Sequence, residues 1–326
     1  MRVRALGRSA AVFVVTLGAC GGPRPPSRHI QFESTSHSAR LANGMRVLVV
    51  EDHATNLVQL GVRLDVGSAS DPIGKAGLAH LVEHLMFQIG EDRPIGAELS
   101  AVAIGFNAHT TWEATQYVTM ARADQLERLL ALEARRFAAS CKSISPGTFE
   151  REREVVRNER RLQGGPSGGD VELLMREIYP AGHPYVRSVA GSDLELSRLT
   201  LADACGFIAA HYRPDRMVVV LSGDIEARRA ISMVRRNLGR LRSRSRPARS
   251  AGRVPDYPAL VAAHRSARGA VMGDSPVVAV AWPMPPAFSH ERAASAIATS
   301  LLHSELTQEQ GPGGLMMELG EARAPV

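Results

Sequence analysis

The sequence predicts an α+β fold in which strands and helices follow one another in an irregular order. Some predicted strands are joined directly by turns, whereas others are separated by helices, and this mixture differs from the regular alternation of a doubly wound sheet. The chain has 326 residues, of which 44% are hydrophobic and 22% are charged. This composition is typical of a globular protein, and the length is sufficient for two domains with sizeable cores.

The first twenty residues have the features of an export signal. Three arginines precede an apolar run over residues 10–19, which is too short to span a bilayer as a helix. The run ends in Leu-Gly-Ala-Cys at Cys20, which resembles the lipobox of bacterial lipoproteins and implies cleavage and lipid attachment there; a plain signal peptide with an incidental cysteine is the alternative. We therefore expect a signal peptide over residues 1–19 and a tether over residues 20–36. The protein would be lipid-anchored in the bacterial cell envelope and face the periplasm.

The first predicted elements of the folded part are strands. Asn43-Gly44 lies between two apolar stretches and predicts a hairpin turn, and residues 58–66 alternate apolar and polar side chains as a half-buried strand does. A short helix over residues 95–104 is expected next. Two further strands follow over residues 106–111 and 115–120, where threonine, tyrosine, valine and tryptophan are abundant.

Two helices with different surfaces follow. Residues 123–139 carry leucine and phenylalanine at helical spacing. Residues 146–162 consist mainly of glutamate and arginine, which is ordinarily the pattern of a solvated helix with ion pairs along its faces. One stripe of this helix combines two carboxylates with its apolar residues: Glu152, Val155, Val156 and Glu159.

The remaining predicted elements again mix helices and strands. A helix over residues 201–212 precedes an unbroken apolar strand over residues 217–221, and another helix covers residues 226–241. Near the end of the chain, residues 277–282 are expected to form a strand and residues 290–305 a helix.

Positive charge is concentrated in one arginine-rich segment. The formal net charge is +6, and residues 240–249 are rich in arginine and contain no acidic residue. Such a run is most often a solvated linker, with nucleic acid or an anionic membrane surface as the weaker alternative. Because no aromatic residues are interleaved with the arginines, we expect a linker over residues 240–253 and no nucleic-acid partner.

The strongest functional signal is the sequence His80-Leu81-Val82-Glu83-His84. On a helix, residues four apart lie on the same face, so His80 and His84 can offer nitrogens to one metal ion. Glu83 lies at the edge of that face, within reach of a water held by the ion. The other positions are apolar, so burial of these three side chains is costly unless something satisfies them. A metal ion does so; two core histidines with hydrogen-bond partners, in a metal-free scaffold, are the alternative.

The H-x-x-E-H spacing is that of the inverted zinc motif of the pitrilysin family of metallopeptidases, which includes the mitochondrial processing peptidase. The chain resembles this family in several further segments, which follow the family order between about residues 40 and 240. They are Leu41-Ala42-Asn43-Gly44, Gly67-Ser68, Asn107-Ala108-His109-Thr110, Thr115-Gln116-Tyr117, Glu152-Arg153-Glu154-Val155-Val156-Arg157-Asn158-Glu159, Gly182-His183-Pro184-Tyr185 and Gly223-Asp224-Ile225. The resemblance implies a pitrilysin-like α+β domain, with a mixed, mostly antiparallel sheet packed with helices.

The resemblance assigns a role to each residue of the site. His80, His84 and Glu159 would hold Zn²⁺. Glu83 would be the general base that takes a proton from the attacking water, and Glu152 would orient the site from outside the coordination shell. This donor set is chemically reasonable, because two neutral imidazoles and one carboxylate leave the ion with a net positive charge and an open fourth position.

The resemblance also implies an edge strand that receives substrate. Asn107 and Ala108 match the strand to which a peptide adds as a further β-strand, through main-chain hydrogen bonds. Extended peptides or unfolded protein segments are therefore the implied substrates. Thr110 and Tyr117 are expected to support this hairpin, and His109 is expected to be structural.

Members of the family normally have two similar domains that face one another around the substrate. Residues 37–239 are expected to form the zinc peptidase domain, and residues 254–326 an incomplete second domain of the same type. Three explanations are open for the short second domain: a truncated or incomplete chain, a second pitrilysin-like subunit that supplies the missing half, or a weakly active zinc protein. The sequence also leaves open whether Cys141 and Cys205 pair.

The expected function is that of a zinc-dependent endopeptidase. A non-catalytic or partner-dependent subunit of the same family, which binds peptides or supports an assembly, is the alternative. Because Glu83 and the expected ligands His80, His84 and Glu159 are all present, the sequence favours the enzyme.

Overall fold

The computed structural model describes residues 36–90, 92–139, 141–163, 172, 175–177, 179–242, 294 and 296–301. The predicted signal peptide with Cys20, most of the tether, the linker beyond residue 242 and the predicted strand over residues 277–282 lie outside these residues, and their boundaries stay predictions. Of the helix predicted over residues 290–305, the described residues are helical. None of the helices in the described part of the chain is long and apolar enough to cross a bilayer.

Six strands in the described part of the chain form one mixed sheet, in the order β1-β2-β6-β3-β5-β4. β2 and β6 are parallel, and the other neighbouring pairs are antiparallel. β4 lies at one edge, and β6 lies between β2 and β3 although it is the last of these strands in sequence. The strands are β1 Ser36–Arg40, β2 Arg46–Glu51, β3 Leu57–Leu64, β4 Gly105–Thr110, β5 Thr115–Arg122 and β6 Met217–Gly223.

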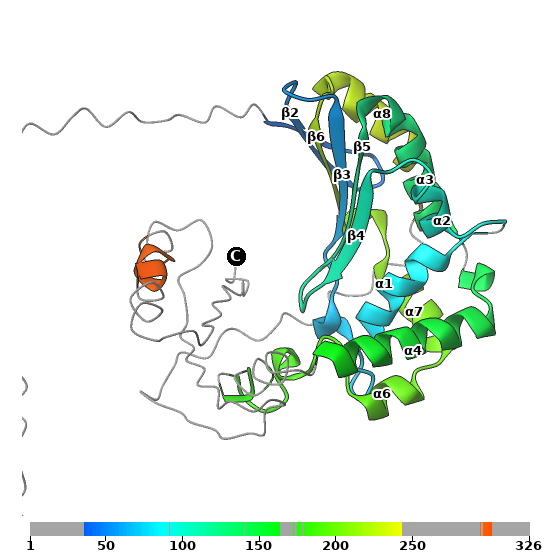
Figure 1. Ribbon diagram of the computed structural model, residues 1–326, viewed down its shortest axis with the longest axis vertical. Coiled ribbons are helices and arrows are strands. Elements are labelled where there is room, and N and C mark those ends of the chain that lie inside the picture. Colours follow the sequence, from blue (N-terminus) through cyan, green and yellow to red (C-terminus); the bar gives the residue numbers. More distant parts are fainter. Residues whose placement is uncertain are drawn as a thin grey trace, which may run out of the picture. The chain divides into compact units, whose positions relative to one another are not determined.

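The helices of this unit cover one face of the sheet, as Figure 1 shows. Along β3, Val58 and Leu60 are at most 1% exposed and belong to the same core as the helices, whereas Gln59 between them is exposed on the other face. This arrangement confirms the predicted α+β fold class. The helices are α1 Leu78–Gln88, α2 Ile95–Leu99, α3 Leu126–Ala138, α4 Pro146–Gln163, α6 Asp193–Arg198, α7 Leu201–His211 and α8 Ala227–Leu238.

The predicted hairpin at Asn43-Gly44 is confirmed, since β1 and β2 pair across it. Gly44 has a φ of +88°, which glycine adopts without strain. The Asn43 side chain accepts a hydrogen bond from the Met45 N–H at 3.2 Å and donates to the Leu238 carbonyl of α8 at 2.9 Å. The turn therefore also attaches the hairpin to the last helix of the unit.

The prediction of a helix over residues 95–104 is correct for its first half and wrong for its second half. α2 ends at Leu99, and the Ile104 N–H donates to the Met120 carbonyl of β5 at 2.8 Å. The chain has therefore entered the sheet by Ile104, and a strand hydrogen bond replaces the helical one.

The sequence interpretation missed α6, although the segment carries a local signal. Ser192 precedes the helix, and its hydroxyl accepts a hydrogen bond from the Glu195 N–H at 3.1 Å. Ser-x-x-Glu is the spacing of a capping box. This pattern in residues 192–195 indicates a helix start that periodicity alone does not reveal.

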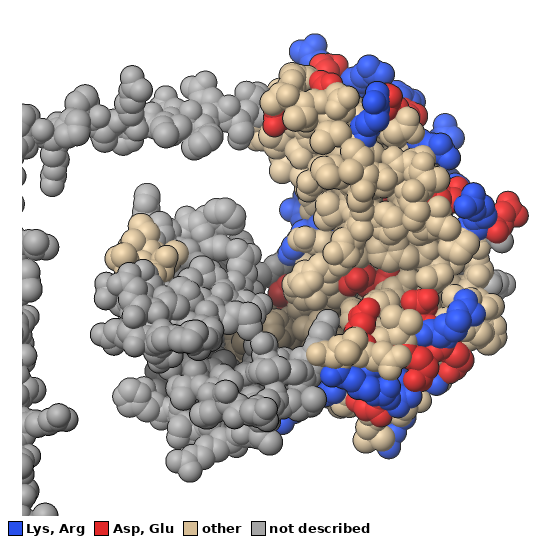
Figure 2. All heavy atoms as spheres, viewed as in Figure 1, with Lys and Arg blue, Asp and Glu red and all other residues tan. Residues whose placement is uncertain are grey.

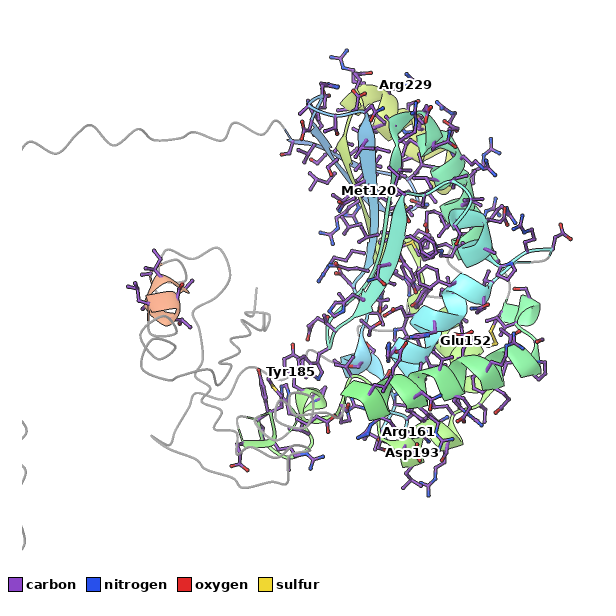
Figure 3. The ribbon with its side chains drawn as sticks, in the orientation of Figure 1. Met120, Glu152, Arg161, Tyr185, Asp193 and Arg229 are labelled. Carbon is purple, nitrogen blue, oxygen red and sulfur yellow. A yellow bond between two sulfur atoms is a disulfide. The ribbon has the colours of Figure 1, made fainter. Side chains whose placement is uncertain are left out.

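α4 is not simply a solvated charged helix, because its arginines attach it to the segment that contains α6. Arg157 binds both carboxylate oxygens of Asp193, at 2.8 and 2.9 Å. Arg153 donates to the Leu199 carbonyl at 3.1 Å. Figure 3 shows Asp193 beside Arg161 on the outer side of α4. The predicted apolar stripe is also narrower than expected, since Val156 is fully buried but Val155 is 41% exposed.

A disulfide joins Cys141 to Cys205, which answers a question that the sequence left open. Cys141 begins the short 3-10 helix Cys141–Ser143 just before α4, and Cys205 lies on α7. α7 packs against α1. The bond therefore connects the start of α4 to the layer that supports α1.

Reduction of the Cys141–Cys205 bond is expected to lower the free energy of unfolding by about 2–4 kcal/mol, because a cross-link between distant residues restricts the unfolded chain. Urea denaturation of the protein with and without reductant measures this difference. The double variant Cys141→Ala/Cys205→Ala has no such bond to reduce, so its midpoint should be the same in both conditions. Equal midpoints for the oxidised and reduced wild type would contradict the expectation.

Candidate metal centre

α1 and α4 lie side by side and bring three potential ligands together (Figure 1). His80 Nε2 lies 3.6 Å and His84 Nε2 3.4 Å from the same carboxylate oxygen of Glu159. One donor atom from each of the three residues lies within 4.8 Å of the others. Ligand atoms around a tetrahedral zinc ion are about 3.4 Å apart. The three side chains predicted as ligands therefore converge, and both distances to Glu159 are close to this spacing.

His80 is held in the form that binds metal. Burial, followed by the charges of His84 and His109, lowers the pKa of His80 to about 4, so its imidazole is neutral near pH 7. Its Nδ1 atom is buried and has no hydrogen-bond partner among the described residues. A neutral imidazole whose Nε2 faces Glu159 fits a metal ligand better than a core histidine satisfied by hydrogen bonds.

His84 lies between two carboxylates of α4. Its Nδ1 is 3.5 Å from Glu152, and its Nε2 faces Glu159 on the other side. Burial opposes protonation, but the hydrogen bond to Glu152 and then the charges of Glu159 and Glu83 outweigh it, so the pKa of His84 is raised. A ring N–H directed at Glu152 would leave Nε2 free for metal, which is the usual arrangement of a histidine ligand. Figure 3 labels Glu152 on the part of α4 that faces α1.

Glu83 contacts the sheet through β4. It is 6% exposed, and its Oε2 atom accepts a hydrogen bond from the Thr110 hydroxyl of β4. Burial raises the pKa of Glu83, and the Thr110 hydrogen bond opposes that rise. The raised pKa makes this carboxylate a better proton acceptor than a solvent-exposed one.

The start of α1 is fixed by close contacts. Gly77 has a φ of +91°, and a Cβ atom there would lie 2.9 Å from the Ala190 carbonyl and 2.8 Å from Leu196. Asp71 accepts hydrogen bonds from the N–H groups of Gly77 and Ala79, both at 2.9 Å. A carboxylate six residues upstream therefore caps the helix that carries the histidines.

The strand predicted to receive substrate is at the edge of the sheet. Asn107 and Ala108 lie on β4, and the Asn107 side chain accepts a hydrogen bond from the Ala108 N–H at 2.9 Å. Two neighbours on β4 were assigned only supporting roles by the sequence. Thr110 in fact contacts Glu83, and His109 contributes to the pKa values of His80 and Glu83. The sequence feature that could have indicated this contact is a threonine on the buried side of a strand, because a buried hydroxyl needs a hydrogen-bond partner.

Acidic side chains gather over α1 and α4, and basic side chains follow the outer side of α4 (Figure 2).

Two neutral histidines and one carboxylate would leave a divalent ion with a net positive charge and one open position. The donor set thus fits a catalytic zinc ion rather than a closed structural one.

Two segments of the chain match known families. Residues 46–163 match the family described as Insulinase (Peptidase family M16), and residues 198–314 match the one described as Peptidase M16 inactive domain. The first segment contains the whole candidate metal centre. The second begins before β6, which pairs with β2 and β3. The second match therefore starts inside the described sheet unit, upstream of the boundary predicted near residue 254.

Several curated relatives are similar to this chain. Zinc protease PqqE of Helicobacter pylori is 28% identical over 249 residues, which is 74% of this chain and 53% of the relative. Human cytochrome b-c1 complex subunit 1 is 26% identical, over 64% of this chain and 44% of the relative. The probable mitochondrial-processing peptidase subunit beta of Schizosaccharomyces pombe is 27% identical, over 63% and 45%. The chain thus spans about half the length of the curated relatives it matches.

The fold is also similar to that of a solved protease structure. The crystal structure of a protease from Helicobacter pylori superposes with a TM-score of 0.62 at 24% sequence identity, covering 69% of this chain and 53% of that one. The two matched segments together cover more than half of the chain, and the mixed sheet and the H-x-x-E-H helix agree with them. The chain therefore belongs to the insulinase family of peptidases, peptidase family M16.

Proposed function

We propose that this protein is a zinc-dependent endopeptidase that hydrolyses extended peptides or unfolded protein segments. The observation that carries the proposal is the convergence of His80, His84 and Glu159 on one point, with Glu83 on the next position of the same helix. The peptidases of this family are zinc-dependent, which supports Zn²⁺ as the ion that the three residues would hold.

The positions of the side chains suggest a catalytic role for each of them. Zinc, when bound, lowers the pKa of a coordinated water toward neutrality and polarises the scissile carbonyl. Glu83 would accept a proton from the attacking water and pass it to the leaving nitrogen, so that one carboxyl group serves as base and then as acid. Glu152 would hold His84 with its Nε2 toward the ion. Each role uses a contact described above.

β4 is the proposed docking site for the peptide. It is an edge strand, and Asn107 is exposed on it. A peptide added along this edge would be held by main-chain hydrogen bonds and would need to be extended, whatever its sequence. Because Thr110 of the same strand contacts Glu83, such a peptide would lie beside the candidate centre.

We further propose that the protein acts in the bacterial cell envelope, anchored through lipid on Cys20. The Leu-Gly-Ala-Cys sequence supports the anchor. The Cys141–Cys205 disulfide supports an oxidising compartment such as the periplasm, because disulfides rarely persist in the cytosol. Mass spectrometry of the membrane fraction would detect a diacylglyceryl group on Cys20, and a soluble, unmodified protein would contradict this part of the proposal.

A second candidate function is that of a non-catalytic or partner-dependent subunit. One observation favours it: a similar protein is a subunit of the cytochrome b-c1 complex. In that case the protein would bind zinc or peptide but would cleave only after a second pitrilysin-like subunit is added, or not at all.

The purified protein is expected to contain close to one zinc ion per chain and to cleave a quenched fluorescent peptide. Removal of the ion with a chelator should abolish cleavage, and added Zn²⁺ should restore it, because no other group at the site can activate water to the same degree. Metal analysis and fluorescence measure both quantities. Stoichiometric zinc without cleavage would favour the second candidate function, and the absence of zinc binding would contradict the zinc-dependent peptidase.

A further inference from the structure

We propose that Thr110 is a positioning residue that holds Glu83 in the orientation needed to act on the attacking water. This inference rests on the proposed function, because it concerns the residue that would be the general base. The Thr110 hydroxyl donates a hydrogen bond to Glu83 Oε2. It is the only hydrogen-bond donor to this carboxylate within the described ranges of the chain.

Glu83 needs such a partner because an unpaired buried carboxylate is costly. It is 6% exposed, and its neighbours Val82 and Leu85 on α1 are fully buried. A buried carboxylate with one fixed oxygen loses most of its rotational freedom, and the other oxygen, Oε1, then points in one direction. Thr110 therefore determines which oxygen of Glu83 is available to the water.

A second threonine lies against the Thr110 hydroxyl and does not compete for its proton. Thr115 is paired with Thr110 across β4 and β5, and the two hydroxyl oxygens are 3.4 Å apart. Thr115 donates its own proton to the Val66 carbonyl at 3.0 Å. Because a carboxylate is a stronger acceptor than a hydroxyl, the Thr110 proton goes to Glu83. Thr110 and Thr115 are 7% and 0% exposed, so water does not compete for these bonds.

Thr110 connects Glu83, the proposed general base, to β4, the strand proposed to bind the peptide. Thr110 is two residues from Ala108, so both side chains lie on the same side of the edge strand to which a peptide would add. One rigid strand would thus place the peptide and hold Glu83. Loss of the hydroxyl should therefore impair the chemical step while leaving peptide binding to the main chain of β4 unchanged.

Thr110→Val tests the inference, because valine keeps the shape of threonine and removes the hydroxyl. Zinc content, KM and kcat are measured on the quenched peptide. We expect kcat to fall about 10–100-fold with zinc content and KM near the wild-type values. Thr110→Ser, which restores a hydroxyl, should recover kcat to within about threefold of wild type. Thr119→Val, at another buried threonine on β5, is the matched control and should behave as wild type.

The outcomes separate this inference from the proposed function. A Thr110→Val enzyme with kcat near the wild-type value would overturn the inference, and so would a loss of activity that serine does not restore. If valine prevents folding, Thr110→Ser and Thr110→Ala are compared instead, and equal kcat values for the two would overturn it. Crystal structures of wild type and Thr110→Val supply a readout that needs no activity: one Glu83 conformer in the wild type and several in the variant support the inference even if the wild type does not cleave. An unchanged Glu83 would contradict it.

Discussion

Replacing Glu83 with Gln is expected to abolish peptide cleavage while leaving zinc bound. Glutamine keeps the shape of the side chain and can still contact Thr110, but it cannot accept a proton from water. General base catalysis of this kind contributes about 10²–10⁴-fold to the rate. Single-turnover assays with the quenched peptide, run beside metal analysis, measure both expectations. The side chain is buried beside the ligands and is not itself one of them, so the metal content should be unchanged.

Glu127→Gln is the control for this variant. Glu127 is exposed on α3, where it binds Arg236 and Asn237 of α8 at 3.2 and 2.8 Å, and it is not one of the converging ligands. It should therefore retain full activity. Cleavage by the Glu83→Gln enzyme at a rate close to that of Glu127→Gln would show that Glu83 is not the base. Loss of zinc from Glu83→Gln would instead point to a structural role.

Replacing Glu159 with Gln is expected to lower the affinity for zinc by more than about 100-fold, which is the upper end of the effect of an outer partner. Glu159 is the one carboxylate among the three converging ligands. Without it, two neutral imidazoles would have to hold a divalent ion with no anionic partner from the protein. Competition with a chromophoric chelator measures the affinity, and cleavage should fall in parallel.

Glu154→Gln is the matched control on the same helix. Glu154 binds Arg157 on the outer side of α4 at 2.7 Å and takes no part in the centre. Its zinc affinity should equal that of the wild type. Thermal unfolding adds a second readout, because zinc stabilises only a protein that binds it. A rise in Tm on adding zinc to Glu159→Gln that matched the rise in Glu154→Gln would refute the assignment of Glu159.

The sequence predicted the parts of the site that depend on local geometry. His80, Glu83 and His84 lie within two turns of one helix, and helical spacing alone places them on neighbouring positions. The same argument placed Glu152 and Glu159 on one stripe of α4. That this stripe meets the histidine face came from the family resemblance, since no local pattern reports how two helices pack.

The parts that the sequence did not predict depend on contacts between distant segments. The hydrogen bond from Thr110 to Glu83 requires β4 to lie beside α1, and the cap from Asp71 requires the loop before α1 to fold back on it. The arginines of α4 looked like solvated charges because the segment around α6, which they bind, lies more than thirty residues away. Each of these features is a contact between segments that are distant in sequence. A prediction from the local pattern of the same residues cannot include such a contact.

The place of β6 in the sheet has a consequence for how the chain acquires its structure. The last candidate ligand along the chain is Glu159, and β6 follows it at Met217–Gly223. In the sheet, however, β6 lies between β2 and β3. Until it arrives, the β1–β2 hairpin and the β3–β5–β4 group share no edge, and each exposes an unpaired strand. Such long-range pairing slows folding. We therefore expect the candidate ligands to converge late in folding, and a fragment that ends with α4 would carry all of them on a sheet that lacks β6.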